Sequence, residues 1–434
     1  MWFIQPVQLA GLAPADAAEP TQWCAVDTCL PSARLLARVT VAVVATLVTT
    51  LGWLPAPARA DWVRSDEWQL QVLGVRTAWR FADGAGVTVA VLDSGVDAGH
   101  PDLAGQVLPG ADFVDGRTDG REDPVGHGTT VAALIAGRAD DNAGVAGVAP
   151  AAKILPVRVL DAQNKYDDAT AVARGLRWAV DHGAAIANLS LGGTGRSPEL
   201  AAAIAYASAH DVVVVACTGN ATAGAARTDI WYPAREPGVV AVAGLAASRH
   251  SPARTTAEEL WSGSLTGPAT ALTAPAADLL GARPGGYWWV QGTSFAAPLV
   301  AGTATLIRSR WPALDAANVV NRLIRTARDL GPAGRDDRFG YGEVDPVTAL
   351  TAAVPPVAGN PLRAADDGAS EGVTRAAEAG VGTAEPVPAD PAAHALTRPA
   401  ALTGPRPVVF TVGVGGLVFL LLLGAGLYVV RRRL

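Results

Sequence analysis

Short apolar runs alternate with longer amphipathic stretches from residue 61 to residue 351. The short runs are apolar on both faces, which is typical of strands in a parallel sheet that is covered on both sides. Strands that alternate with helices of this length predict a three-layer α/β domain with a mainly parallel central sheet. The predicted strands are residues 87–92, 154–160, 186–191, 212–217 and 239–245, and the predicted helices are residues 129–137, 168–181, 199–210, 299–307 and 315–327.

A further apolar run lies before this domain. Arg34 and Arg38 precede the uncharged residues 39–54, and an Ala-Arg-Ala sequence ends at Ala60. This order predicts that residues 1–60 are a secretory signal segment, cleaved after Ala60. Retention as an anchor is the alternative, although the run is shorter than the ~20 residues of a spanning helix. Residues 1–33 are long for the start of a signal, which a misassigned start codon would explain.

The last apolar run, residues 408–430, is uncharged and is followed by three arginines. At ~1.5 Å per residue, a helix of this length spans a bilayer core of ~30 Å. The arginines place the tip, residues 431–434, in the cytoplasm and the domain outside. Residues 352–407 are rich in Ala, Pro and Gly and lack aromatic residues, which predicts a disordered linker. We therefore expect a single-pass protein of the cell membrane with an extracytoplasmic domain.

Composition and charge exclude several kinds of function. The formal net charge of −6 offers no basic field for nucleic acid, so we expect no nucleic-acid partner. Cys24 and Cys29 precede the expected cleavage site, which leaves Cys217 as the only thiol of the mature chain. We expect Cys217, at the end of a buried strand, to be an inert core thiol. The six histidines are scattered, and no zinc-type spacing occurs.

Polar residues beside glycines gather at the ends of the predicted strands. Asp93 directly follows the first strand, Ser190-Leu191-Gly192 closes the third, and Asn220 follows the fourth. His127 opens a helix, and Ser294 precedes the apolar run that begins at residue 299. Each residue alone could be a turn former or a helix cap. Their coincidence at the carboxyl ends of parallel strands, where sites of such sheets lie, favours a functional site.

These residue types are the ones that nucleophilic catalysis needs. A serine hydroxyl is a poor nucleophile until an imidazole takes its proton, and a carboxylate fixes the imidazole's tautomer. Asp93, His127 and Ser294 supply the three groups. At the start of a helix the backbone N–H of Ser294 is unpaired and the dipole favours negative charge. With the side-chain amide of Asn220, it could form an oxyanion hole.

The sequence around these residues resembles the signature blocks of the subtilisin-like serine proteases, peptidase family S8. The chain order Asp, His, Ser also matches that family and differs from the chymotrypsin and α/β-hydrolase orders. The resemblance implies a subtilisin-like fold and a serine endopeptidase. The three blocks are Asp93-Ser-Gly-Val-Asp97, Gly126-His-Gly-Thr129 and Gly292-Thr-Ser-Phe-Ala-Ala-Pro298.

The resemblance also implies a role for each candidate residue. Asp93 would be the orienting acid, His127 the general base and Ser294 the nucleophile, with Asn220 as a donor of the oxyanion hole. The residues that would bind the substrate backbone and border the pocket for the residue before the scissile bond are Ser190, Leu191 and Gly192.

Within the family, the layout of signal, protease domain, linker, single helix and basic tip resembles the mycosins. These are membrane-anchored actinobacterial proteases associated with type VII secretion. The segment from Trp68 to Trp79 is also mycosin-like, although mycosins commonly carry disulfides and this mature chain has one cysteine. The expected partners are a protein or peptide substrate, the membrane and the type VII secretion machinery. Two alternatives are a mainly structural component of a secretion complex and a general cell-surface degradative subtilase.

The resemblance requires no cofactor, and we expect no metal site. Some subtilases bind calcium, and Asp102, Asp141 and Asn142 lie roughly where they do. Acidic residues are common in surface loops, so a solvated loop is the alternative to a calcium site.

Overall fold

The computed structural model describes residues 62–141, 143–166, 168–221, 229–247 and 259–363, and the backbone of 398–399. The expected signal segment, most of the expected linker and the apolar run at 408–430 lie outside these residues. Within the described part of the chain, no helix combines the length and the apolar character needed to cross a membrane.

The described chain contains all five predicted strands and all five predicted helices, most with ends shifted by one or two residues. The strands are β1 (Thr88–Asp93), β2 (Ala111–Asp112), β3 (Lys153–Arg158), β4 (Ile186–Leu189), β5 (Val213–Cys217), β6 (Val240–Ala246), β7 (Glu259–Leu260), β8 (Leu272–Pro275), β9 (Leu279–Arg283), β10 (Gly286–Val290) and β11 (Arg398–Pro399). The helices are α2 (Trp62–Ser65), α3 (Trp68–Val72), α4 (Val75–Ala78), the 3-10 helix η1 (Pro101–Leu103), α5 (His127–Ala136), α6 (Ala169–Asp181), α7 (Pro198–Ala209), α8 (Thr293–Arg310), α9 (Ala316–Arg325) and α10 (Pro346–Thr351).

The central sheet has the order β2-β3-β1-β4-β5-β6-β7, and β8 also pairs with β6. Every pairing in it is parallel except that of β6 with β7, so the prediction of a mainly parallel sheet is confirmed. The chain leaves β1 toward β3 on one side and later continues with β4 on the other. This change of direction opens a crevice beyond the carboxyl ends of β1 and β4.

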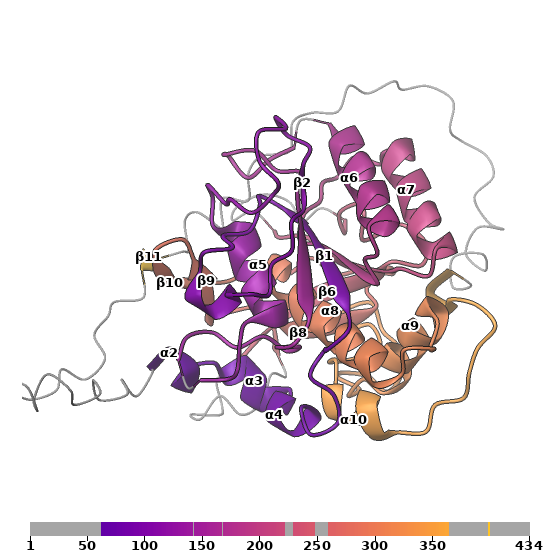
Figure 1. The fold of residues 1–434 in the computed structure, drawn as a ribbon. Coiled ribbons are helices and arrows are strands. Elements are labelled where there is room, and N and C mark those ends of the chain that lie inside the picture. Colours follow the sequence, from indigo (N-terminus) through magenta and orange to yellow (C-terminus); the bar gives the residue numbers. More distant parts are fainter. Residues whose placement is uncertain are drawn as a thin grey trace, which may run out of the picture. The chain divides into compact units, whose positions relative to one another are not determined.

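Helices cover both faces of the sheet, which gives the three layers expected from the sequence (Figure 1). In β1, Val89 and Val91 belong to the same core as residues of α5 and α8. Ala90 and Leu92 belong to a second core with residues of α6 and α7. Because successive residues of a strand point to opposite faces, a strand buried on both faces must be apolar throughout. This requirement explains the continuous apolar runs.

The hairpin of β9 and β10 was not predicted, and it leads the chain into α8. The two strands pair antiparallel in register from Leu279 with Val290 to Arg283 with Gly286. The hydroxyl of Thr130 in α5 donates a 2.8 Å hydrogen bond to the carbonyl of Ala282. The hairpin therefore fixes the start of α8 relative to α5. A signal was available, because Pro284-Gly-Gly286 separates two short runs that contain leucine and aromatic residues, but the sequence reasoning missed it.

The ordered chain continues beyond Thr351, where we expected the linker to begin. Asn321 of α9 donates a 2.9 Å hydrogen bond to the carbonyl of Pro355. Asn318 accepts from the N–H of Val357 at 2.8 Å and donates to its carbonyl at 3.1 Å. Residues 352–360 form neither helix nor strand, which agrees with the composition. Composition cannot show that amide side chains elsewhere supply the backbone's hydrogen bonds.

Candidate active site

Asp93 and His127 meet at the carboxyl edge of the sheet. Asp93 is the last residue of β1, and His127 is the first residue of α5. Nδ1 of His127 lies 2.7 Å from Oδ1 of Asp93, and both side chains are buried. A Cβ at Gly128 would lie 2.0 Å from the carbonyl oxygen of Gly95 and 3.0 Å from the Cβ of Asp93. The glycine after His127 therefore allows α5 to approach the end of β1.

The carboxylate of Asp93 uses one oxygen for its hydrogen bonds. Oδ1 accepts from the N–H of Ser94 at 2.8 Å in addition to its contact with His127. Oδ2 is buried and has no hydrogen-bond partner among the described residues. The imidazole is thus the principal ionisable partner of this carboxylate, as expected for an orienting acid.

The environment of His127 favours its charged form. Burial lowers the pKa of this imidazole, but the charge of Asp93 and its hydrogen bond outweigh burial. The net result is a pKa raised above the usual value for histidine. Arg283 of β9 acts in the opposite direction, and the charge of Asp123 acts in the same direction as that of Asp93. A base with this pKa holds a proton more strongly than free imidazole does.

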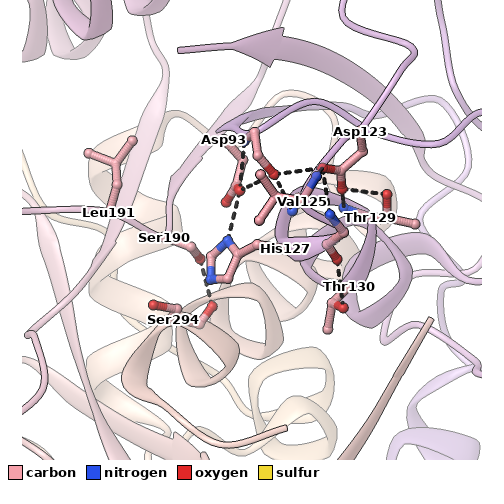
Figure 2. A network of polar contacts seen from close by, with 12 residues as sticks. Asp93, Asp123, Val125, His127, Thr129, Thr130, Ser190, Leu191 and Ser294 are labelled. Carbon is pink, nitrogen blue, oxygen red and sulfur yellow. Dashed lines mark hydrogen bonds and ion pairs between the residues drawn. The ribbon is translucent and has the colours of Figure 1, made fainter. Parts of the chain in front are cut away.

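Ser294 lies in the first turn of α8, beside the imidazole (Figure 2). The ring of the next residue, Phe295, packs against His127 with 5.2 Å between ring centroids. The Ser294 hydroxyl is directed to the sulfur of Cys217 at 4.0 Å, and it makes no hydrogen bond to His127 within the described residues. Rotation about the Cα–Cβ bond changes which neighbour the hydroxyl meets. Catalytic hydrogen bonds often form only when substrate is bound.

Cys217 is buried, as predicted, but its neighbour was not foreseen. Its Sγ is 3.7 Å from the carbonyl oxygen of Leu191 and 4.0 Å from the hydroxyl of Ser294. The thiol therefore lies between the expected substrate-binding segment and the candidate nucleophile. No sequence pattern indicated this contact, because it joins residues of separate elements.

Asn220 is held in place by the residue before Ser294. Its Oδ1 accepts from the N–H of Thr293 at 2.9 Å and from the hydroxyl of Thr293 at 3.0 Å. Since Oδ1 takes both bonds, Nδ2 is the donor end of the amide. Thr293 was missed by the sequence reasoning, although it lies within the quoted block around Ser294.

The segment Ser190-Leu191-Gly192 lies directly after β4, which ends at Leu189, two residues before the predicted end of the strand. The hydroxyl of Ser190 donates to the carbonyl of Ser294 at 2.6 Å and accepts from Nδ2 of Asn188 at 2.9 Å. This side chain therefore ties the segment to the start of α8. Contact of this segment with a substrate stays a prediction.

Asp123 is a second buried carboxylate beside His127, and the sequence reasoning missed it. It lies in the loop before α5, where it bonds with Ser94, Gly126 and Thr129 (Figure 2). The available signal was an aspartate four residues before the histidine. An acidic residue in a loop is too common to identify a site without its contacts.

The two described residues that were considered for calcium make hydrogen bonds with protein groups. The carboxylate of Asp102 accepts from the N–H of Val145 at 2.6 Å and from the hydroxyl of Tyr287 at 3.1 Å. Asp141 accepts from the N–H of Ala143, and Asn142 lies outside the described residues. Across the described ranges, no group of three or more His, Cys, Asp or Glu residues could hold a metal ion. Asp102 thus serves protein donors.

Comparison with known proteins places all of these site residues within one family match. The model of the subtilase family matches residues 84–342. Subtilisin DY of Bacillus licheniformis is 37% identical over 264 residues, which are 60% of this chain and 88% of that protein. Fervidolysin of Fervidobacterium pennivorans is 36% identical over 311 residues, which are 66% of this chain. The chain spans 44% of the length of fervidolysin.

A solved structure extends the comparison to the fold. The crystal structure of MycP1 from the ESX-1 type VII secretion system is similar, with a TM-score of 0.60 and 31% sequence identity. The match covers 68% of this chain and 88% of MycP1.

Proposed function

Because this chain belongs to the subtilase family and is a serine peptidase of the subtilisin type, we propose that it is a membrane-anchored extracytoplasmic endopeptidase. In this proposal Asp93, His127 and Ser294 form its catalytic triad. The supporting observation is the buried 2.7 Å hydrogen bond from His127 Nδ1 to Asp93 Oδ1, with Ser294 beside the same imidazole (Figure 2). The bond fixes the tautomer that leaves Nε2 able to accept a proton.

The first chemical step transfers the acyl group to the enzyme. Ser294 Oγ attacks the carbonyl carbon of the scissile bond while its proton passes to Nε2 of His127. The carbonyl electron pair moves to oxygen, and Nδ2 of Asn220 and the N–H of Ser294 donate to that oxyanion. His127 then gives its proton to the departing nitrogen as the carbon–nitrogen bond breaks. The product is an ester of Ser294.

Water completes the cycle through the same groups. His127 takes a proton from water as its oxygen attacks the ester carbon. The proton then passes to Ser294 Oγ as the carbon–oxygen bond breaks, which releases the second product as a carboxylic acid. Asp93 keeps its hydrogen bond to Nδ1 throughout and compensates the positive charge of the imidazolium.

The sequence and one structural relative support the proposed location and partner. The export signal expected in residues 1–60 and the helix expected at 408–430 support a cell-membrane location with the C-terminus in the cytoplasm. The similarity to MycP1 supports association with a type VII secretion system. The substrate is a protein or peptide that reaches the extracytoplasmic face.

The test compares three forms of the full chain in isolated membranes. Ser294→Ala removes the nucleophile and should abolish hydrolysis of a peptide library. Ser309→Ala changes a serine at the other end of α8, whose hydroxyl bonds with the carbonyl of Ala85. This control should retain the wild-type rate. Equal hydrolysis by wild type and Ser294→Ala would contradict the proposal.

A secretion assay separates the enzyme from a structural component. If the proposal holds, Ser294→Ala expressed in a deletion strain should fail to restore processing of the secreted substrate. Full restoration of secretion by Ser294→Ala, together with loss of secretion when residues 408–434 are removed, would favour the structural role instead. A reporter protein that works only in the cytoplasm should be active when it is fused after Leu434.

A further inference from the structure

Asp123 accepts hydrogen bonds from more groups than its neighbour Asp93 does. Its side chain is buried, in the loop that leads into α5 (Figure 2). The donors to Oδ1 are the hydroxyl of Ser94 at 2.8 Å and the N–H groups of Val125 at 3.0 Å and Gly126 at 2.7 Å. The donors to Oδ2 are the N–H and the hydroxyl of Thr129, at 2.8 and 2.6 Å.

These bonds fix the backbone on both sides of His127. Gly126, the residue before the histidine, has a left-handed backbone conformation with φ of 85°. As a glycine, it has no side chain that could cap the helix. Asp123 supplies the missing cap, because it binds the N–H groups of Gly126 and Thr129. The hydroxyl of Thr129 also accepts from the N–H of Asp97, which joins α5 to the chain after β1. Asp123 therefore holds the backbone that carries the imidazole.

Ser94 connects the two carboxylates. Its Oγ is 2.8 Å from Oδ1 of Asp123 and 3.3 Å from Oδ1 of Asp93. A hydroxyl has one proton, and the shorter contact directs that proton to Asp123. Oγ in turn accepts from the N–H of Gly128 at 3.1 Å. As a result, the Ser94 hydroxyl competes less with His127 for hydrogen bonding to Oδ1 of Asp93.

We propose that Asp123 is a positioning residue for the general base, holding the first turn of α5 and drawing the proton of Ser94 away from Asp93. This inference rests on the proposed function of His127. Three charged groups act on the imidazole: Asp93 at the end of β1, Arg283 of β9 and Asp123. The stem of Arg283 packs on Gly126, where a Cβ would lie 3.1 Å from its Cγ and Cδ. Without Asp123, the guanidinium would act against Asp93 alone.

The first variant is Asp123→Asn in the full chain. It keeps the size of the side chain but removes its charge and turns one acceptor into a donor. We expect kcat/KM to fall by roughly 10- to 100-fold, because the imidazole is misplaced. The acid limb of the pH profile should move to lower pH, because the charge of Asp123 raises the pKa of His127. Active-site titration with a serine-directed sulfonyl fluoride counts the folded enzyme.

Asp345→Asn is the matched control. Asp345 caps α10 in the same way, by accepting from the N–H of Thr348 at 2.9 Å and from its hydroxyl at 2.7 Å. It lies outside the proposed machinery. A merely structural role for Asp123 predicts that both variants lose stability and keep the wild-type acid limb. That outcome, or a kcat/KM for Asp123→Asn within about twofold of wild type per titrated site, would overturn the proposal.

A second variant covers the case in which Asp123→Asn does not fold. Ser94→Ala removes the bridge between the carboxylates and leaves four of the donors to Asp123 in place. It should lower kcat with little change in KM, because the N–H of Gly128, the residue after His127, loses its acceptor and the first turn of α5 is held less firmly. An unchanged kcat with an unchanged acid limb would overturn the proposal.

The imidazole can also be observed without turnover. In the inactive Ser294→Ala chain, NMR titration of His127 should give a lower pKa when Asp123→Asn is added and an unchanged pKa when Asp345→Asn is added. This readout separates two failures. A lower pKa without any Ser294-dependent hydrolysis in the wild type would contradict the proposed function and leave the positioning role supported. Hydrolysis with an unchanged pKa would contradict the positioning role only.

Discussion

Two of the places where carboxylates are buried in this molecule differ in their surroundings. The catalytic-edge cluster contains Asp93 and Asp123, next to His127 at the start of α5. The N-terminal cluster contains Glu67 and Asp102, near the short helices that precede β1. Burial raises the pKa of both carboxyl groups in the N-terminal cluster, more strongly for Glu67.

The two clusters differ in the number and type of hydrogen-bond donors that surround their carboxylates. Asp123 binds N–H groups and hydroxyls at the start of a ten-residue helix, whose dipole favours negative charge. Glu67 has the N–H of Ala146, the side-chain amide of Gln69 at 3.4 Å and one contact with Arg64, at 3.2 Å. The same guanidinium also donates to the carbonyls of Ala143 and Gly144. Its attraction lowers the pKa of Glu67, but burial has the larger effect.

The same residue type therefore serves different purposes at the two places. At the catalytic edge, hydrogen bonds hold two carboxylates near an imidazole that gains and loses a proton in the proposed reaction. In the N-terminal cluster, the carboxyl groups join the first helices to the loop around Ala146, and their ionised form is penalised by burial. Substitutions should thus change rate in the first cluster and the pH dependence of stability in the second.

The largest effect is expected for Asp93→Asn. The amide would hold the imidazole in the wrong tautomer and remove the charge that compensates the imidazolium. We expect kcat to fall by about 10⁴-fold at neutral pH, measured with a peptide substrate, while the melting temperature changes little. A loss of less than tenfold would mean that this buried pair is not part of the reaction.

The second-largest loss of activity is expected at Asn220, the proposed side-chain donor of the oxyanion hole. Asn220→Ala removes the side-chain donor of the oxyanion hole and should reduce kcat by roughly 100- to 1,000-fold with little change in KM. Thr293→Val is the comparison, because it deletes only one of the two bonds that orient Asn220 and should reduce kcat less. Equal losses for both variants would assign the effect to disturbance of α8.

Glu67→Gln should alter stability and leave the acid limb of activity unchanged. The folded-state pKa of Glu67 is raised above 4.5, so the native state binds this proton more tightly than the unfolded state does. Stability from this group therefore falls as pH rises from 4.5 to the folded pKa, by about 1.4 kcal/mol for each pH unit between the two pKa values. Urea unfolding across this range should show a flatter pH dependence for Glu67→Gln. An identical slope would show that Arg64 offsets burial.

The smallest effect is expected for Tyr287→Phe. This change removes the hydroxyl that donates to Oδ1 of Asp102. In the wild type, that hydrogen bond lowers the pKa of the Asp102 carboxyl. The free energy of unfolding should decrease by about 1 kcal/mol near neutral pH, and the folded pKa of Asp102 should rise further. Denaturation curves test the first expectation and NMR titration tests the second. A shifted acid limb of activity would mean that the two clusters are coupled.

The sequence by itself determined the layered fold and the identity of the main candidates. Continuous apolar runs, alternating with helical stretches, favoured strands covered on both faces, and their ends placed Asp93, Asn220 and the segment from Ser190 at one edge. The family match to residues 84–342 agrees with the three blocks read from the sequence. These features are local, because each depends on a short stretch of residue types in a fixed order.

Only the tertiary structure decided which side chains support those candidates. Asp123 came to light through its bond with Ser94, Thr293 through its two bonds with Asn220, and Cys217 through its contact with Ser294. Each of these contacts joins segments that lie apart in the chain, and polar residues in loops carry no periodic signal. Burial and hydrogen bonding depend on how loops and helices pack around the sheet, and that packing exists only in the folded chain.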